Sequence, residues 1–507
     1  LLGNLREIYL HFKEVHPNDK IGFSKFCEFR PKWCITAGVS GTHSVCVCTI
    51  HQNVKLMLSA LHGTKIEYAD LISKMVCDSS SKNCMLHRCN TCPGKPAVQQ
   101  YLEEQLAEHY DDEDEIVFKQ WQHTDRTTLI TQQLNVDDYI QDMCNKIDIL
   151  TAHDFIAKHQ AAYLRNLKAN LANDTAIIIL DFAENYSFVL QDCAQGFYWD
   201  NSQATVHPFS VYYLSDTGEV KTLSLACISD SLKHDTVAVY AFQKVVLAYL
   251  KEQIPTLRKV IYFSDGAASQ YKNYKNFVNL KNHATDFGLV AEWHFFATSH
   301  GKSSCDGIGG TLKRLARRAS LQRPLEGQIL TPEDLFAWCS ENIRHIHCFY
   351  VTQDDIEANL PALEERFSRV TTIPGTRDNH SFVPLSVSEL KVSRVSGDDT
   401  HFIAKEGRKT PLSIQPGNYI ACIYDGKWWL GNVLENDQQF DDVKVQFMHP
   451  AGPAASFRWP DREDICWVPL SHVLANIPAP STTRRARQYR LTTKSKQEIT
   501  KAYAEFK

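Results

Sequence analysis

The segment that most constrains the fold lies at residues 175–182 and reads TAIIILDF, an apolar run that carries Asp181 near its end. An uninterrupted apolar run of this length is typical of a strand buried on both faces. Strand and helix patterns then alternate along the chain. Strands are expected at 204–214, 221–228, 258–264 and 290–297, and helices at 235–252, 272–285 and 304–319. Three strands followed by helix, strand, helix, strand and helix predict a mixed sheet with helices packed on it, which is an α/β class.

Length and composition place further limits on the class of protein. With 507 residues, of which 43% are hydrophobic and 22% charged, the chain is expected to form several globular domains. No window approaches the roughly 18 uninterrupted apolar residues of a membrane span, so we expect no membrane partner. The net charge of -5 excludes a uniformly basic nucleic-acid coat but allows basic patches on single domains. The chain opens on Leu1 without a Met or a secretory pattern, so we interpret it as a fragment or a processed chain.

Changes of pattern along the chain predict its domain boundaries. After residue 416, short strand-like pieces alternate with turn residues, which is the rhythm of a small SH3-like or Tudor-like β-barrel. In order, the predicted segments are a helical region at 1–35 that could form a helix-turn-helix, a zinc-binding module at 36–95, an acidic linker and helical region at 96–173, the α/β core at 174–370, a linker at 371–415, the barrel at 416–475 and a basic tail at 476–507.

Cysteine and histidine spacing predicts a metal-binding module in the first part of the chain. Two pairs, Cys48 with His51 and Cys89 with Cys92, have the two-residue spacing of tetrahedral zinc knuckles and could close one site together. A second site could draw on Cys46, Cys77 and Cys84 with either His43 or His87. The alternative is a set of buried free thiols, and which ligands share an ion is left open. The predicted ligands of structural Zn²⁺ are Cys46, Cys48, His51, Cys77, Cys84, Cys89 and Cys92.

Two carboxylates lie at the ends of predicted buried strands. Asp181 ends the first strand, and Asp265 ends the strand at 258–264. A carboxylate in this position is costly unless it accepts hydrogen bonds or holds a cation. The first and fourth strands are neighbours in an RNase H-like sheet, so we expect both carboxylates at one edge. Asp306, at the start of the helix at 304–319, is the expected third acid, with Glu292 as its competitor.

Three carboxylates around two divalent cations suit phosphoryl transfer, because the cations activate the attacking oxygen and stabilise the leaving one. We therefore expect Mg²⁺ or Mn²⁺ as a cofactor. The alternative role of each acid is a turn or a helix cap, since Asp readily accepts hydrogen bonds from backbone N–H groups.

Three strings carry a family resemblance: LDFAENYS from residue 180, YFSDGAASQYKN from residue 262 and FFATSHGKSSCDGIGGTLKRL from residue 295. Through them, residues 175–320 resemble the DDE transposase and retroviral-integrase superfamily, and transposon-derived proteins in particular. Integrases are similar in layout, with a zinc module, an RNase H-like core and an SH3-like barrel. The resemblance implies Asp181, Asp265 and Asp306 as the catalytic acids, although the third acid of the family is usually Glu. It also implies His300 as an auxiliary catalytic group, with Glu184 as an auxiliary or structural acid.

Small and basic residues near the acids predict a nucleic-acid interface. The turn after Asp265 has small residues that would let a phosphate backbone approach. A basic stripe at three-to-four spacing follows on the helix at 304–319, which is the geometry of a phosphate-contacting face. Its alternative is an ordinary solvated surface. The candidate nucleic-acid contacts are Gln270, Lys272, Lys275, Lys313, Arg314, Arg317 and Arg318.

The C-terminal region adds two further expectations. Most aromatic residues of the barrel should form its core, and the rest could form a cage for the methylated lysines of histone tails. The basic tail is expected to contact DNA or to act as a nuclear-import signal.

The sequence as a whole predicts a nuclear DNA transposase or integrase-like recombinase that acts on DNA as a homo-oligomer, hydrolysing phosphodiesters and transferring strands. The alternatives are a domesticated, non-catalytic DNA- or chromatin-binding protein and an RNase H-like nuclease.

Overall fold

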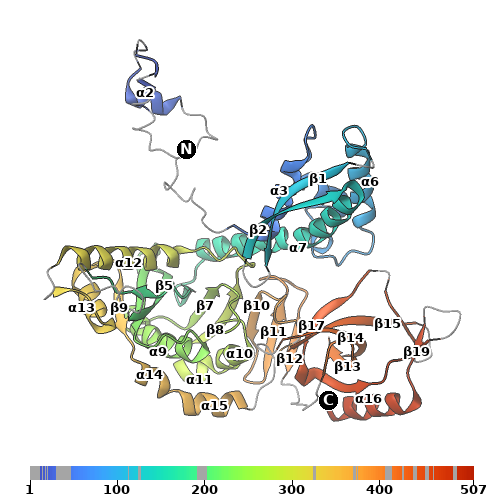
Figure 1. The fold of residues 1–507 in the computed structure, drawn as a ribbon. Coiled ribbons are helices and arrows are strands. Elements are labelled where there is room, and N and C mark those ends of the chain that lie inside the picture. Colours follow the sequence, from blue (N-terminus) through green and yellow to red (C-terminus); the bar gives the residue numbers. More distant parts are fainter. Residues whose placement is uncertain are drawn as a thin grey trace. The chain divides into compact units, whose positions relative to one another are not determined.

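The computed structural model describes residues 9, 12–13, 15–17, 19, 21–29, 47–111, 114–123, 127–190, 202–323, 327–368, 373, 375–405, 414–424, 427–437, 442–451, 456–460, 462–482 and 488–506. The chain divides into two compact units, Leu1–Ala152 and His153–Lys507. Figure 1 labels their helices and strands. Among the described residues, no helix combines the length and the apolar character that crossing a lipid bilayer requires.

The first unit combines short helices with one hairpin. Its helices are α2 (Phe23–Glu28), α3 (Thr49–Ala60), α4 (Tyr68–Met75), α5 (Lys82–Met85) and α6 (Lys95–Leu106), and its hairpin pairs β1 (Glu115–His123) with β2 (Thr127–Asn135). Asn53 on α3 binds β1 through two hydrogen bonds. Its side-chain amide donates to the Trp121 carbonyl at 2.9 Å and accepts from the Trp121 N–H at 2.8 Å. The hairpin replaces part of the acidic linker expected there. Its signal in the sequence is weak, because the apolar Val117 between the buried Ile116 and Phe118 is exposed and breaks the alternation of polar and apolar residues.

The second unit is built on a 10-stranded mixed sheet. Its central strands are β3 (Thr175–Leu180), β5 (Gln203–Leu214), β6 (Val220–Ser229), β7 (Lys259–Ser264) and β8 (Val290–Phe295), close to the predicted ranges. They lie in the order β6-β5-β3-β7-β8. In this order β3, β7 and β8 are parallel, and β5 is antiparallel to both β3 and β6. Every residue of β3 is buried, as the apolar run predicts.

Helices cover both faces of this sheet (Figure 1). On one face lie α9 (Thr236–Gln253), α10 (Tyr274–Lys281), α11 (His283–Phe287), α14 (Gln353–Glu357) and α15 (Leu360–Ser368). On the other lie α12 (Ser304–Gln322), α13 (Pro332–Asn342) and the later part of α7 (Val136–Ala169). Alternate side chains of a strand point to opposite faces, so β3 serves both layers. Ile178 joins the cluster under α9, whereas Ile179 joins the cluster under α7.

The sheet extends further at both edges than the sequence predicts. At one edge, β9 (His347–Tyr350) pairs with β6 in a part of the core for which no strand is predicted. At the other, β10 (Ser381–Pro384) pairs with β8 and is followed by β11 (Glu389–Ser393) and β12 (Phe402–Lys405). These strands lie in the region expected to be an irregular linker, so the core continues beyond the predicted end at residue 370. They are short and rich in polar residues, so their sequences carry little periodic signal.

The C-terminal part forms a curled antiparallel half-barrel. Its elements are β13 (Tyr419–Tyr424), β14 (Lys427–Asp437), β15 (Asp442–Pro450), β16 (Ser456–Arg458), β17 (Ile465–Pro469), β18 (Val473–Ile477), β19 (Ser481–Thr482), β20 (Tyr489–Arg490) and α16 (Thr493–Phe506). Gly431 lets β14 approach β15, because a Cβ there would lie only 2.3 Å from Cγ1 of Val445. Ile499 of α16 is buried in this module, so part of the expected basic tail belongs to a packed structure.

Two glycines of α12 differ in what surrounds them. A Cβ on Gly309 would lie 3.0 Å from Cβ of Ala183, just beyond β3, and 3.3 Å from Cγ of Pro208 on β5. Around Gly310, by contrast, no atom of the described residues lies within 4 Å of the equivalent position. The absence of a side chain at Gly309 therefore allows α12 to approach the end of β3 and the middle of β5 closely.

We expect Gly309→Ala to destabilise the protein by about 1–3 kcal/mol, because the added methyl group must push α12 away from the sheet. Gly310→Ala is the matched control and should be neutral or stabilising by up to about 1 kcal/mol, since Ala is the better helix former. Urea unfolding of both variants measures the difference. Equal stability of the two variants would contradict the close packing at Gly309.

Candidate metal centres

Four cysteine thiols gather in the first unit after the end of α4. Cys77 follows α4, Cys84 lies in α5, and Cys89 and Cys92 lie in the turns before α6. The Sγ atom of Cys77 lies 3.4 Å from that of Cys84, 3.7 Å from that of Cys89 and 3.6 Å from that of Cys92. All four Sγ atoms lie within 4.8 Å of one another. Tetrahedral zinc with Zn–S bonds of about 2.3 Å sets its sulfurs roughly 3.8 Å apart, so the cluster could hold a zinc ion.

The backbone around the cluster is shaped to bring the thiols together. His87 adopts a left-handed conformation with φ of 59°, which turns the chain sharply between Cys84 and Cys89. The N–H of Gly94 donates to the carbonyl of Met75 at 3.0 Å, so the chain returns to α4 after Cys92. These local turns bring the four ligands together within a short stretch of the chain.

The thiols are within hydrogen-bond distance of one another and of Thr91. Hydrogen bonding with Cys84, and then with Cys92 and Cys89, raises the pKa of Cys77 to about 12. Hydrogen bonds from the side chain and the backbone of Thr91 lower the pKa of Cys89 to about 6. Thr91 is a contributor that ligand spacing does not identify, and its hydroxyl lies 3.2 Å from the Cys89 sulfur. A zinc ion would displace the thiol protons, because thiolates are its ligands.

The structure narrows the ligand combinations that the sequence leaves open. Cys89 and Cys92 lie with Cys77 and Cys84, which favours a four-thiol cluster over one site formed by Cys48/His51 and Cys89/Cys92. His87 is not a member of the cluster, because its Nε2 atom contacts the carbonyl oxygen of Asp148 at 3.0 Å. Cys46 and His43 lie outside the described residues.

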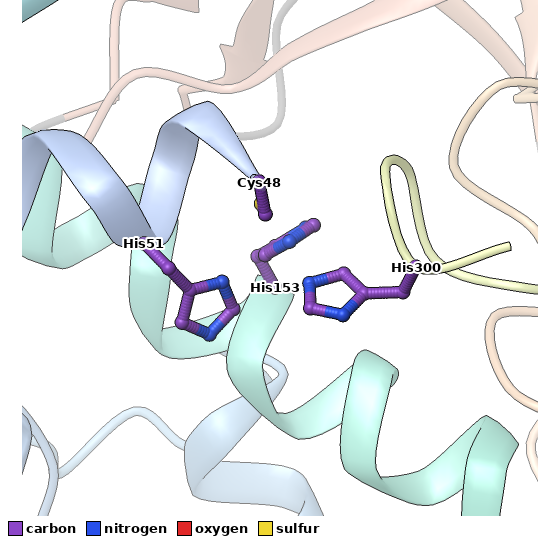
Figure 2. A group of neighbouring side chains, drawn as sticks. All are labelled: Cys48, His51, His153 and His300. Atoms are coloured by element: carbon purple, nitrogen blue, oxygen red, sulfur yellow. The ribbon is translucent and has the colours of Figure 1, made fainter. Parts of the chain in front are cut away.

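Two further pairs of zinc-type ligands are present, one in each unit. Cys48 is the N-cap residue of α3, and His51 lies in the first turn of that helix (Figure 2). In the second unit, His153 lies on α7 and His300 in the loop after β8, with their ring centroids 5.1 Å apart (Figure 2). Each pair supplies two of the four ligands that a structural zinc site requires. The sequence predicts that His300 assists catalysis. The structure places its ring in contact with the ring of His153.

We expect the full-length protein to bind zinc through the four thiols, and Cys77→Ser or Cys92→Ser to remove one equivalent per chain. Binding at such sites is worth on the order of 10–16 kcal/mol, so the first unit should also lose its cooperative unfolding. Zinc content by elemental analysis and unfolding by circular dichroism measure these effects.

Cys27→Ser is the control, because that half-buried thiol lies outside the cluster. Unchanged zinc content in both cluster variants would contradict the assignment. A further equivalent that is lost in His51→Ala would assign another ion to the Cys48–His51 pair.

Asp181 and Asp265 leave the sheet at the same level on neighbouring strands. Ile179 of β3 pairs with Phe263 of β7 in a parallel ladder, and each aspartate follows its strand residue by two positions. Adjacent strands lie about 4.8 Å apart, so the two carboxylates are placed side by side. The register confirms that the first and fourth predicted strands are neighbours.

Asp306 is brought toward the same strand ends by α12. Its neighbour Cys305 is buried and donates from its thiol to the Ile179 carbonyl of β3 at 3.3 Å. The loop before α12 passes Asp265 closely, since a Cβ on Gly301 would lie 3.0 Å from Cβ of Asp265. Both contacts fix the start of α12 beside the ends of β3 and β7.

The three carboxylates interact electrostatically, although they are distant in sequence. Burial and, after it, the charges of Asp265 and Asp306 together raise the pKa of Asp181 to about 7, against a hydrogen bond from the Phe182 backbone. Burial also raises the pKa of Asp265, opposed by the Ala267 N–H and the charge of Lys272. The arrangement concentrates negative charge at one edge of the sheet, and a cation would relieve this repulsion.

Two of these acids also make the local bonds expected of turn and cap residues. Oδ1 of Asp265 accepts from the Ala267 N–H at 3.1 Å. Oδ2 of Asp306 accepts from the Ser303 N–H at 2.8 Å as part of a capping box that starts α12. Each carboxylate has further acceptor capacity beyond this single bond.

The competing acid Glu292 occupies a different environment. It lies within β8, is 9% exposed, forms an ion pair with Lys259 at 3.0 Å, and has a carboxylate oxygen 3.4 Å from Nε2 of His294. Hydrogen bonds and charges from these partners outweigh burial and lower its pKa to about 2. Glu184 is 94% exposed and lies 3.9 Å from the ammonium of Lys313. The structure therefore associates Asp306, and not Glu292, with the two strand-end aspartates.

The predicted nucleic-acid contacts fall into three groups. Exposed side chains are those of Lys275, Arg314, Arg317 and Arg318, and partly buried ones are those of Gln270 and Lys313. Lys272 differs from the expectation, because it is 6% exposed and donates to the carbonyl of Arg377 at 2.8 Å. Its ammonium lies beneath the turn that follows Asp265 and is not available to strand phosphates.

The aromatic residues of the half-barrel are mostly engaged within the protein. The ring of Trp467 is covered by the guanidinium of Arg377, 3.8 Å from the ring centroid. The indole N–H of Trp429 donates to the Tyr424 carbonyl at 3.0 Å. These two rings therefore serve internal contacts, and the cage for methylated lysine stays a prediction.

Family comparisons divide the chain in a way that follows the structure. Three family models match, each described as a domain of unknown function: DUF8699 at residues 1–38, DUF8700 at residues 49–151 and DUF8701 at residues 160–396. The second match ends one residue before the end of the first unit, and the third runs from α7 to just beyond β11. No curated protein and no solved structure matches the chain. The function is therefore inferred from the sites themselves.

In EDTA at pH 8, we expect Asp181→Asn to stabilise the protein by on the order of 1–3 kcal/mol, which is less than the full shift because solvent screens part of it. The pKa of the folded carboxyl is raised from 3.8, so the penalty of ionising it is absent below about pH 4 and complete above about pH 7. The variant should therefore match the wild type at pH 4. Urea unfolding at both pH values measures this, with Asp216→Asn in the exposed turn after β5 as the surface control.

Proposed function

We propose that the chain is a DDE-type transposase or integrase-like recombinase, with Asp181, Asp265 and Asp306 as its catalytic acids. The observation that carries this proposal is the parallel register of β3 and β7, which brings Asp181 and Asp265 to the same level on neighbouring strands, with the start of α12 and Asp306 beside them. An acid cluster of this kind at the edge of a sheet is more typical of a functional site than of a structural one.

The strand order supports an RNase H-like core. The order β6-β5-β3-β7-β8 combines an antiparallel β3-β5-β6 meander with the parallel strands β3, β7 and β8. This is the order in which the sequence resemblance would place the first two acids on adjacent strands. The thiol cluster in the first unit and the half-barrel at the C-terminal end also agree with the layout of integrases, in which they would be a zinc module and an SH3-like domain.

The donor set fits a hard divalent cation such as Mg²⁺ or Mn²⁺. Such ions take carboxylate oxygens, and the burial of Asp181 together with the neighbouring negative charges would be compensated by a bound cation. When bound, a pair of these ions activates an attacking oxygen and stabilises the leaving one in an in-line displacement. The three carboxylates would orient this chemistry on a DNA phosphodiester. Water would be the nucleophile in the first step, and the freed 3′-hydroxyl would be the nucleophile on target DNA in the second.

The residues around the acids supply a surface suited to DNA. Arg314, Arg317 and Arg318 are exposed on α12, the helix that begins beside the acids. Basic side chains on such a face would neutralise strand phosphates and make binding dependent on salt. Action on DNA as a homo-oligomer in the nucleus belongs to the same proposal.

The second candidate is a domesticated DNA- or chromatin-binding protein without catalysis. It is favoured by the local bonds of Asp265 with the Ala267 N–H and of Asp306 with the Ser303 N–H, which give both acids a structural role of their own. In this case the sheet would be a scaffold, and DNA binding would not depend on the acids.

DNA cleavage distinguishes the candidates. The full-length protein should nick supercoiled plasmid DNA in Mn²⁺ or Mg²⁺, and Asp181→Asn, Asp265→Asn and Asp306→Asn should each lower the rate at least about 100-fold. Asp216→Asn, in an exposed turn, is the matched control and should retain full activity.

Transfer of a 3′-hydroxyl end to a second duplex would separate a recombinase from an RNase H-like nuclease, which would only hydrolyse. If the wild type and the three acid variants nick equally, or if none of them nicks, the catalytic proposal is wrong. Salt-sensitive DNA binding that persists in all variants would then favour the second candidate.

A further inference from the structure

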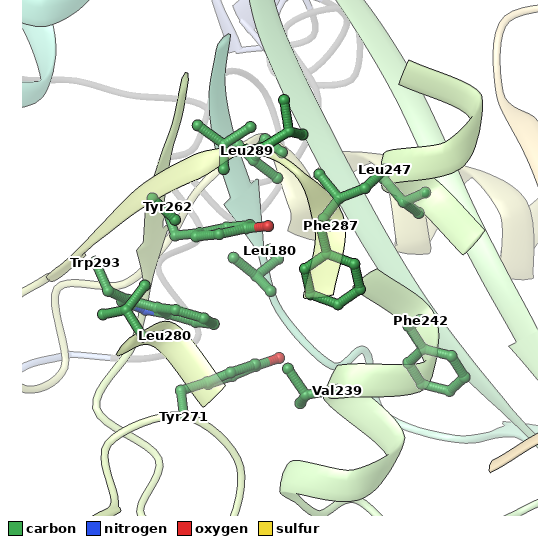
Figure 3. Close-up of a cluster of buried hydrophobic side chains, with 14 of the residues drawn as sticks. Leu180, Val239, Phe242, Leu247, Tyr262, Tyr271, Leu280, Phe287, Leu289 and Trp293 are labelled. Atoms are coloured by element: carbon green, nitrogen blue, oxygen red, sulfur yellow. The ribbon is translucent and has the colours of Figure 1, made fainter. Parts of the chain in front are cut away.

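Tyr271 closes the turn that begins at Asp265. Its N–H donates to the carbonyl of Ala267 at 2.9 Å, and Oδ1 of Asp265 accepts from the N–H of the same residue at 3.1 Å. The side chain of Tyr271 is fully buried and points into the core beneath the sheet (Figure 3). The residue therefore links the Asp265 turn to the interior of the protein.

The phenol of Tyr271 is bonded to a neutral histidine. Its hydroxyl lies 2.8 Å from Nε2 of His207 on β5. His207 is fully buried, and burial lowers the pKa of its imidazole to about 3, so the ring is neutral at physiological pH. A neutral imidazole offers one donor and one acceptor, so Nε2 can accept a hydrogen bond from the phenol O–H.

The same phenol lies close to Asp181 and Asp265. Burial raises the pKa of Tyr271, and the charges of Asp181 and Asp265 raise it further. A hydrogen bond from the backbone of Phe182, the residue directly after Asp181, acts on the phenol in the opposite sense. The ring of Tyr271 also lies 6.1 Å from that of Phe182, centroid to centroid, so this residue links the chain next to Asp181, the neighbouring strand β5 and the turn that carries Asp265.

We propose that Tyr271 is a positioning residue that sets the spacing between Asp181 and Asp265. The inference rests on the proposed function, because it assigns the spacing to the binding of a divalent cation shared by the two carboxylates. The hydroxyl of Tyr271 bonds to His207 on β5, and the backbone of Tyr271 belongs to the turn that Asp265 begins. Loss of the hydroxyl would leave the ring packed but would remove its hydrogen bond to His207. That bond ties the Asp265 turn to β5, the strand next to β3, and so limits the distance between Asp181 and Asp265.

The core contains a matched control in Tyr262 on β7. Its ring is also fully buried, and its hydroxyl lies 2.9 Å from Nε2 of the buried His283. Trp293 lies between the two tyrosines, with ring centroids 4.7 Å from Tyr262 and 5.9 Å from Tyr271 (Figure 3). Tyr262 differs from Tyr271 in the group that it bonds to besides histidine. Burial raises the pKa of Tyr262, and a hydrogen bond with the side chain of Gln243, rather than with the backbone next to Asp181, opposes the rise.

The experiment compares Tyr271→Phe with Tyr262→Phe in the full-length protein. Each removes one buried hydroxyl bonded to one histidine, so both should lower the unfolding temperature in EDTA by a similar few degrees. Mn²⁺ affinity, measured from the electron paramagnetic resonance signal of the free ion, should fall about 10-fold or more in Tyr271→Phe. It should stay within about 2-fold of the wild type in Tyr262→Phe.

His207→Phe removes the other end of the bond and should weaken Mn²⁺ binding like Tyr271→Phe, which provides a second route should one variant fold poorly. If the wild type binds Mn²⁺ and Tyr271→Phe binds it equally well, the positioning role is wrong while the proposed function stands. If the wild type binds no Mn²⁺, the proposed function and this inference are both overturned. Equal weakening in Tyr262→Phe would reduce Tyr271 to a general contribution to stability and would also overturn the inference.

Discussion

The parallel pairing of β3 with β7 is the constraint on which the rest of the second unit depends. Its register places Asp181 and Asp265 at the same height on neighbouring strands, where the ends of buried strands leave little water to solvate them. Neighbouring elements bring two further charged groups close to these aspartates. α12 brings Asp306 to the same edge, and the buried ammonium of Lys272 lies beneath the Asp265 turn. A sheet with another register would separate these groups, and none of the site would remain.

Much of the central fold follows from the sequence because its signals are periodic and long. The apolar run at 175–182 and the alternation of strands and helices after it predict β3, β5, β6, β7 and β8, and the parallel neighbours follow from their order. The outer strands β9 to β12 and the β1–β2 hairpin are different. They are short or exposed on one side, so pairing with a neighbour determines their structure more than their own composition does.

The sites show a similar limit. A carboxylate at the end of a buried strand is visible in the sequence, because the energetic cost of such a position is independent of the partner. The sharing of ligands is not visible, since a two-residue spacing fixes how two ligands lie within one turn but not which other pair meets them. Cys77, an isolated cysteine in the sequence, is the member of the thiol cluster that contacts the other three. Tyr271 and Lys272 carry no local signal because their roles arise from burial.

The two close glycines near the acids have a consequence for how relatives of this chain should be compared. Gly301 and Gly309 are favoured by packing, since a methyl group at either position would meet Asp265 or Ala183 at 3.0 Å and would force a shift. A relative that lacked the proposed activity would still gain stability from both glycines, whereas the buried carboxylate of Asp181 would only cost it stability. Shared glycine-containing strings would thus record common ancestry alone. Joint retention of the carboxylates across diverging lineages would be the signature of an activity still under selection.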